Sequence, residues 1–271
     1  MSDFDPVILI HGAWQGSWAW ARFIPYLDAA GFTVRAVDLP GNGVDGSHPA
    51  DTTFGSCLEH VFGIVRAFDR PVSLVGHSGG GLLVTAFAER WPERTSRLVY
   101  VAGMMLPGGE SFEELVKSVS VRHPEASGIW PHLEWSEDRR VSRVPAEAAI
   151  AFFLQDCDPT EAAAAVAQLT PQGEGGRAVI TPATAERYGR IPRLYVEALD
   201  DRSVILPVQR AMQVRAPGAL IVSLKTGHAP QFSAPTHLAE AILPFLASPR
   251  QTKADPVSIL THNPLGNCNL D

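Results

Sequence analysis

Short runs of consecutive apolar residues recur in the first half of the chain and again near its end. They are rich in Val, Ile and Leu, and they are almost continuously apolar rather than alternating. This pattern is typical of strands that are buried on both faces of a parallel sheet. It predicts about six strands, at Val7–His11, Thr33–Val37, Val72–Val75, Leu98–Ala102, Leu194–Val196 and Leu220–Leu224.

Amphipathic stretches separate these apolar runs. Strands that alternate with helices form a doubly wound sheet, in which the crossover connections are right-handed. The predicted fold class is therefore α/β, with a mostly parallel sheet. The spacing of apolar residues along one helix face predicts helices at Trp18–Ala30, Phe54–Phe68, Leu82–Arg90, Val208–Arg215 and Thr236–Leu246.

One interval, from Met104 to about Arg190, interrupts the alternation. It has no convincing buried strand, it is rich in Ala, Glu and Pro, and it contains helical stretches at Glu113–Val119 and Thr160–Leu169. We expect a helical insertion that forms a cap over the carboxyl ends of the strands. The predicted organisation is an α/β core of residues 1–103 and 191–247, a cap of residues 104–190, and a loosely packed C-terminal tail of residues 248–271.

Composition and charge narrow the functional classes. Hydrophobic residues make up 45% of the 271 residues and charged residues 19%, a balance that supports a large buried core. The net charge of −7 repels phosphate groups, which argues against a nucleic-acid partner. Cys57, Cys157 and Cys268 have neither a disulfide pattern nor the spacing of metal ligands, so we expect no metal site and no cofactor.

The sequence also bears on location and partners. No apolar run approaches the roughly 20 residues that a membrane helix needs, and residues 1–6 lack the basic and apolar regions of a signal peptide. We therefore expect a cytoplasmic protein that acts on a small molecule and binds no membrane. Its oligomeric state, monomer or homodimer, is left open.

The segment Gly76-His77-Ser78-Gly79-Gly80 lies between a predicted strand and a predicted helix. This is the context in which a G-x-S-x-G sequence forms a sharp turn that lifts a nucleophilic serine out of the sheet. Side chains at the flanking positions would clash on such a turn, which explains the glycines. The segment therefore predicts Ser78 as the nucleophile and the amide of Gly79 as one donor of an oxyanion hole.

A second oxyanion donor is expected from the loop after the first strand, His11-Gly12-Ala13-Trp14. Such a donor is a backbone N–H that faces the serine from a neighbouring strand end. Ala13 can supply it, because Gly12 allows a close approach of the backbone. We expect His11 to hold this loop by hydrogen bonds rather than to take part in catalysis. Trp14 either lines the substrate pocket or packs in the core.

The general base and its orienting acid are expected after the last two strands. His228 follows the last predicted strand, in agreement with the chain order Ser, Asp, His of this kind of site. His77 is not favoured as the base, since adjacent residues on a turn point apart. The acid should follow the preceding strand, where Asp200 and Asp201 are both candidates.

Several segments together resemble a known family. They are the stretch from Val7 to Val44, the string GHSGG, the loop DDRSVILPVQ and the late Gly227-His228 pair. These segments are similar to those of the plant methylesterase and hydroxynitrile lyase branch of the α/β hydrolases and of its bacterial esterase relatives. The resemblance extends from Val7 to about Leu246. Family members carry the catalytic Asp eight residues before a Gln, which here is Gln209, so the resemblance implies Asp201 as the acid.

The resemblance also separates esterases from lyases. The lyases carry a Thr after the first-strand His and a Lys after the catalytic His, whereas this chain has Gly12 and Ala229 there. The resemblance therefore implies an esterase. The stretch Gln155-Asp156-Cys157, followed by Pro159, is also similar to the bacterial esterases, and the sequence offers no mechanistic reason for it.

These features predict a serine esterase that cleaves a small to medium carboxylic ester (methyl, aryl or alkyl, or a lactone) through an acyl-enzyme. Ser78, His228 and Asp201 would form the triad. Two alternatives stay open: a lyase or cyclase that uses the same triad without net hydrolysis, and a hydrolase-like receptor for a small ligand. The predicted pocket residues are Gly12, Trp14, Met104, Trp130, Phe152 and Phe153.

Overall fold

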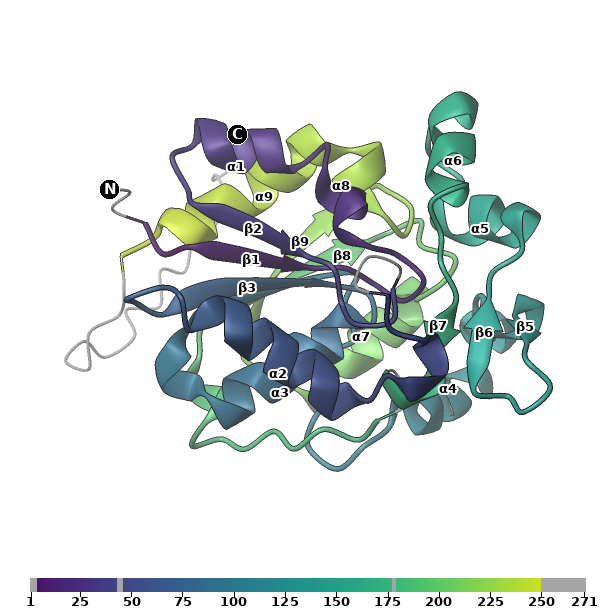
Figure 1. Ribbon diagram of the computed structural model, residues 1–271, viewed down its shortest axis with the longest axis horizontal. Coiled ribbons are helices and arrows are strands. Elements are labelled where there is room, and N and C mark those ends of the chain that lie inside the picture. Colours follow the sequence, from purple (N-terminus) through teal and green to yellow (C-terminus); the bar gives the residue numbers. More distant parts are fainter. Residues whose placement is uncertain (1–3, 43–45, 177–178, 250–271) are drawn as a thin grey trace, which may run out of the picture.

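A six-stranded sheet forms the centre of the protein. The computed structural model describes residues 4–42, 46–176 and 179–249 (Figure 1). The strand order is β2-β1-β3-β4-β8-β9, and each neighbouring pair in this sheet is parallel. The predicted α/β fold is therefore confirmed. The strands are β1 (Val7–Ile10), β2 (Val34–Val37), β3 (Val72–His77), β4 (Thr95–Val101), β8 (Arg193–Ala198) and β9 (Ala219–Leu224).

Two layers of helices cover the sheet (Figure 1). Successive side chains of a strand point to opposite faces, so that in β1 Ile8 and Ile10 pack in the core under one layer and Val7 and Leu9 in the core under the other. Each face of the sheet thus has its own hydrophobic core. The layer of helices on the face to which Ile8 points contains α2 (Phe54–Val65), α3 (Gly80–Arg90) and α7 (Leu206–Arg215). The layer on the face to which Val7 points contains α1 (Ile24–Ala29) and α9 (Pro235–Ala247).

Local sequence signals explain where several helices begin. Thr53 caps α2 and forms a capping box with Ser56, which satisfies backbone N–H groups that have no partner within the helix. The helix predicted at Trp18–Ala30 is divided in the structure, into a 3-10 turn at Ser17–Trp20 and α1. The division follows from Pro25 in the first turn of α1, because proline is accommodated at the start of a helix but not in its interior.

The two edge strands differ from the central ones. All residues of β1 and β3 are buried, as the apolar runs predicted. In β9, however, Leu220 is 63% exposed and Ile221 45% exposed, and in β2 only Val37 is buried. The expectation of burial on both faces is therefore wrong for these two strands. The reason is their position at the edges of the sheet, where β9 pairs only with β8 and β2 only with β1.

The chain between β4 and β8 is here called the β4–β8 insertion. Its α-helices and short strands gather at one end of the molecule, away from the N-terminus (Figure 1). It contains a small antiparallel sheet that the sequence did not predict, because strands of two or three residues show no periodicity. Its elements are α4 (Phe112–Ser120), β5 (Glu134–Trp135), β6 (Val141–Arg143), α5 (Ala146–Phe153), α6 (Pro159–Val166) and β7 (Gln172–Gly173).

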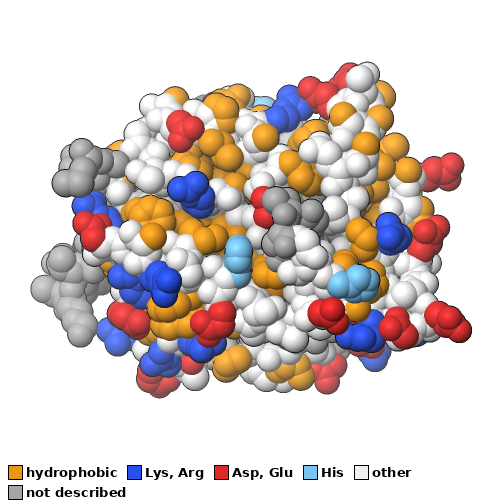
Figure 2. Space-filling model, in the orientation of Figure 1, with side chains coloured by type: hydrophobic (Ala, Val, Ile, Leu, Met, Phe, Trp, Pro, Cys, Tyr) orange, Lys and Arg blue, Asp and Glu red, His pale blue; other side chains and the backbone are white. Residues whose placement is uncertain are grey.

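Surface charge, helix hydropathy and possible metal ligands also bear on the partners that the sequence analysis considered. Acidic and basic side chains are intermingled over the face shown in Figure 2. No helix of the described residues is long and apolar enough to cross a bilayer. The same residues contain no cluster of three His, Cys, Asp or Glu side chains that could hold a metal ion. The predicted tail lies outside the described residues from position 250 onward.

Candidate active site

Ser78 lies on a sharp turn between β3 and α3. Its φ of +49° is in the left-handed region, which is strained for a residue with a side chain. Glycines make the turn possible: a Cβ on Gly76 would stand 2.7 Å from the carbonyl oxygen of Gly80, and a Cβ on Gly80 would stand 2.7 Å from that of His11. The amide of Met104 donates to the carbonyl oxygen of Ser78 at 2.8 Å and holds the turn in place.

Ser78 opens into a cavity of about 220 Å³ beneath the β4–β8 insertion. Its walls are mostly apolar, which is typical of a site for an organic ligand. Besides Ser78, five residues of the predicted site border it, namely Ala13, Trp14, Gly79, Met104 and Trp130. Further walls, which the sequence did not assign, are Leu82, Phe112, Val116, Ile129, Ile180 and Val204.

Three predicted pocket residues lie elsewhere. Gly12 lies behind Ser78, where an added Cβ would be 3.0 Å from the Ser78 Cβ. The ring of Phe153 packs on the His228 ring, with 5.3 Å between the ring centroids, and Phe152 packs on His132 at 4.7 Å. Consecutive residues of a helix point in different directions, so Phe152 and Phe153 at the end of α5 could not both face one cavity.

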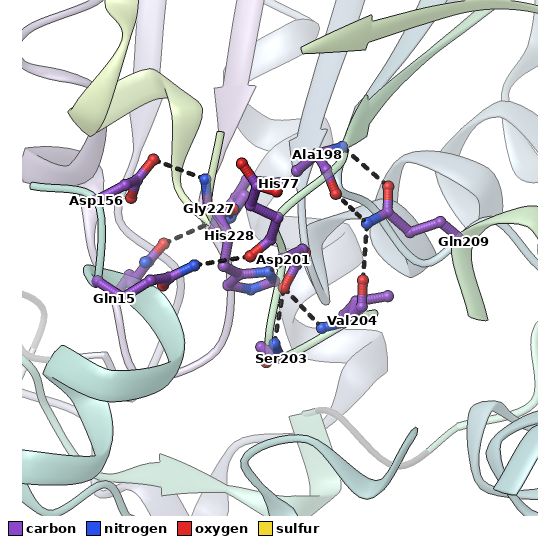
Figure 3. Close-up of polar contacts among 12 residues, drawn as sticks. Gln15, His77, Asp156, Ala198, Asp201, Ser203, Val204, Gln209, Gly227 and His228 are labelled. Atoms are coloured by element: carbon purple, nitrogen blue, oxygen red, sulfur yellow. Dashed lines mark hydrogen bonds and ion pairs between the residues drawn. The ribbon is translucent and has the colours of Figure 1, made fainter. Parts of the chain in front are cut away.

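His228 is held by Asp201 (Figure 3). The His228 Nδ1 lies 2.7 Å from Asp201 Oδ2, and both side chains are buried. The other carboxylate oxygen, Oδ1, accepts hydrogen bonds from the amides of Ser203 (2.7 Å) and Val204 (2.9 Å). Since Nδ1–H donates to a carboxylate, Nε2 keeps its lone pair and can accept a proton. The structure thus brings Asp201 to His228, and not its neighbour Asp200.

Gln209, which the sequence analysis used only to count positions, braces the loop that carries Asp201 (Figure 3). This fully buried side chain accepts from the Ala198 amide at 3.1 Å and donates to the Ala198 carbonyl at 2.9 Å. It also donates to the carbonyl of Val204 at 2.7 Å. One amide therefore ties the two ends of the loop together, which fixes the position of Asp201 between them.

His77 contacts the backbone of His228. Its Nε2 donates to the backbone carbonyl of His228 at 2.9 Å, and its Nδ1 lies 3.0 Å from the side-chain amide of Gln15. Complete burial lowers the pKa of His77 well below the usual value, and the nearby His228 lowers it further. His77 is therefore neutral at ordinary pH. Gln15 was not predicted, because nothing in the local pattern marks a lone Gln as a partner of His77.

The burial of His77 and His11 predicts how stability depends on pH. Burial lowers the pKa of both side chains below 6.5, so the unfolded chain binds more protons at acidic pH. The contribution of these two groups to the free energy of unfolding should be fully present above about pH 6.5. It should decrease as the pH drops below this value, by about 1.4 kcal/mol per pH unit for each group. Thermal melts of His77→Gln between pH 7 and 5 should show a smaller decline in Tm than the parent protein.

The matched control for this measurement is His60→Gln, since His60 is exposed. This variant should follow the pH dependence of the parent protein. Identical declines in Tm for His77→Gln and His60→Gln would contradict the assignment of a neutral, buried His77.

Ala13 and Gly79 border the same cavity as Ser78. The Ala13 amide nitrogen is 3.8 Å from the position that a Cβ on Gly79 would take, so the two residues lie side by side. Within the described part of the chain, neither the Ala13 nor the Gly79 N–H is hydrogen-bonded to another protein group. Two unpaired donors beside a serine can bind an oxygen that gains negative charge.

Comparison with known proteins agrees with this geometry. Residues 7–241 match the alpha/beta hydrolase family. The chain is 31% identical to a pyrethroid hydrolase from Sphingobium wenxiniae over 92% of each chain. It is 28% identical to methylesterase 17 from Arabidopsis thaliana, over 84% of this chain and 86% of the plant protein.

A solved structure supports the same assignment. The crystal structure of a pyrethroid hydrolase from Sphingobium faniae superimposes with a TM-score of 0.77 at 28% identity, over 90% of this chain and 98% of that one. The resemblance to methylesterases and bacterial esterases that the sequence indicated is confirmed. The predicted class of enzyme, a carboxylic ester hydrolase, agrees with these relatives. The chain belongs to the α/β hydrolase family.

Proposed function

We propose that Ser78, His228 and Asp201 form a catalytic triad that hydrolyses a carboxylic ester. One observation carries the proposal: the 2.7 Å hydrogen bond between His228 and Asp201 lies beside the turn that presents Ser78 to an apolar cavity. The link between them is His77, which precedes Ser78 and contacts the His228 backbone. A nucleophile, a base and an orienting acid are the three groups that acyl transfer requires.

The proposed reaction has two steps. Ser78 Oγ attacks the ester carbonyl while His228 Nε2 takes the hydroxyl proton, and the Ala13 and Gly79 amides bind the oxyanion, each with about 3 kcal/mol of transition-state stabilisation. His228 returns this proton to the alcohol as the C–O bond breaks. A water molecule then attacks the acyl-enzyme, His228 takes its proton and passes it to Ser78, and the acid leaves. Asp201 holds the imidazole in one tautomer throughout.

The cavity supports an ester with a bulky apolar part. The β4–β8 insertion supplies Phe112, Val116 and Trp130 to its walls, and we propose that the insertion acts as a cap that selects the substrate. The relatives from Sphingobium are named as hydrolases of pyrethroids. Hydrophobic aryl and alkyl esters of this bulk are therefore the substrates that we propose. A cytoplasmic location, the boundaries of the cap, and the choice between monomer and homodimer stay predictions.

The test of the proposed function is hydrolysis of nitrophenyl esters from acetate to decanoate, together with labelling by a fluorophosphonate. We expect steady turnover that is highest for acyl chains of intermediate length, and a single covalent adduct on Ser78. Turnover that stops after one equivalent of product would favour the alternative function, a hydrolase-like receptor for a small ligand. No turnover and no adduct would contradict the proposal.

A substitution in the cavity wall tests the role of the insertion. Val116→Phe should lower kcat/KM for octanoate by roughly tenfold or more and leave acetate almost unchanged, because one or two lost methylene sites correspond to about 1–3 kcal/mol. The matched control is Val121→Phe, at the end of the same helix, since Val121 is 83% exposed and is not among the residues that border the cavity. A parallel loss for both esters in Val116→Phe would contradict the assignment of Val116 to the substrate site.

A further inference from the structure

We propose that Gln155 and Asp156, two residues of the β4–β8 insertion just beyond α5, are positioning residues that hold the base and the acid of the triad in place. The inference rests on the proposed function for its effect on catalysis. It assigns a role to the stretch Gln155-Asp156-Cys157, for which the sequence offered none.

Asp156 holds the loop that carries the base (Figure 3). Its Oδ2 accepts a hydrogen bond from the amide of Gly227 at 2.6 Å and another from the hydroxyl of Ser233 at 2.9 Å. Gly227 directly precedes His228, and Ser233 ends the short helix α8 (Pro230–Ser233) that follows it. One carboxylate oxygen thus fixes the chain on both sides of His228, from a position 71 residues away in the sequence.

Gln155 holds the loop that carries the acid. Its Nε2 donates to the backbone carbonyl of Asp200 at 2.9 Å, and Asp200 directly precedes Asp201. The Asp200 amide in turn donates to the carbonyl of Thr226 at 3.0 Å, which joins the acid loop to the base loop. Two adjacent side chains of the insertion therefore complete a ring of contacts around both loops.

The close packing at Gly227 shows how tightly the insertion meets the base loop. A Cβ at this position would stand 2.6 Å from both Asp156 Oδ1 and Gln155 Nε2. A larger residue there would displace the side chains of Asp156 and Gln155, which explains why a glycine precedes His228. The neighbouring Cys157 makes no side-chain hydrogen bond to either loop within the described residues, and burial raises the pKa of its thiol to about 12.

The consequence for catalysis is geometric. His228 must reach the Ser78 hydroxyl and then the leaving oxygen, and a misplacement of about 1 Å in such a site can lower the rate by about 10²-fold. The contacts of Asp156 and Gln155 do not touch the substrate. Their loss should therefore lower kcat with little change in KM.

The experiment compares Asp156→Ala and Gln155→Ala with Asp156→Asn, which keeps an oxygen acceptor for Gly227 and Ser233. The matched control is Asp158→Ala: Asp158 caps α6 through the amides of Thr160 and Glu161, so its removal loosens the insertion without touching Gly227. Two quantities are measured, namely kcat and KM on a nitrophenyl ester, and the downfield proton NMR signal of the His228 Nδ1–H in the hydrogen bond to Asp201.

We expect Asp156→Ala and Gln155→Ala to lower kcat between about 10-fold and 100-fold and to broaden or shift the NMR signal. Asp156→Asn should recover most of the activity, and Asp158→Ala should retain both kcat and the signal. Wild-type kcat and signal in both alanine variants, or an equal loss in Asp158→Ala, would overturn the inference. The NMR signal requires no substrate. If the wild-type protein hydrolysed no ester, the proposed function would be contradicted, and the NMR comparison would still decide whether Gln155 and Asp156 position His228.

Discussion

Replacing Ser78 with Ala is expected to lower kcat for ester hydrolysis by about 10⁴- to 10⁶-fold. The substitution removes the only atom that forms the acyl bond in the proposed mechanism. It leaves the apolar cavity and the amides of Ala13 and Gly79 in place, so a non-reacting ester analogue should bind with nearly unchanged affinity. The measurement is steady-state turnover of a nitrophenyl ester, combined with calorimetric titration of the analogue.

The control for this prediction is Ser127→Ala, since Ser127 also borders the cavity. We expect this variant to retain turnover within a few-fold of the wild type and to react with the fluorophosphonate. If Ser78→Ala retained wild-type turnover, Ser78 could not be the nucleophile, and neither the adduct nor the triad would describe this protein.

The second large effect is expected for Asp201→Asn, with a loss of about 10⁴-fold in kcat. Because Asp201 Oδ1 accepts from the amides of Ser203 and Val204, an Asn must keep its oxygen on that side. Its NH₂ group then faces His228 Nδ1, where the carboxylate oxygen stands in the wild type at 2.7 Å. Two donors cannot pair, so the imidazole must carry its proton on Nε2. In that tautomer it cannot accept the proton of Ser78.

The neighbouring Asp200 provides the matched control. It carries the same side chain one position earlier, but its contacts in this region are made by its backbone: the carbonyl accepts from Gln155 and the amide donates to Thr226. Asp200→Asn should therefore keep kcat close to the wild-type value. Equal losses in the two variants would indicate a general disturbance of the loop rather than a change of tautomer at His228.

Strong local signals explain which parts of the fold could be predicted. The turn that carries Ser78 requires glycine at 76 and 80, because a Cβ on either residue would overlap backbone atoms, and this requirement is visible in the sequence. The central strands are visible because they are continuously apolar. The contact between Asp201 and His228 is different: the two residues are 27 positions apart, and only the family resemblance favoured Asp201 over Asp200.

The walls of the cavity were much harder to predict. Phe112 and Val116 are four positions apart on α4 and share one helix face, yet nothing in their spacing says whether that face meets the core or a substrate. Phe152 and Phe153 were predicted for the pocket on their apolar character alone. The packing of the insertion on the sheet decides these positions, and that packing depends on contacts between distant segments.

The left-handed backbone conformation at Ser78 has opposite consequences for stability and for the proposed activity. A residue with a side chain at φ +49° folds with a penalty of about 1–3 kcal/mol, from which glycine is exempt. Selection for thermostability alone would therefore favour glycine at this position, which would remove the proposed nucleophile. Directed evolution for heat resistance should accordingly include a screen for esterase activity at every round, because the substitution that relieves strain at this turn is also the one that removes the hydroxyl of Ser78.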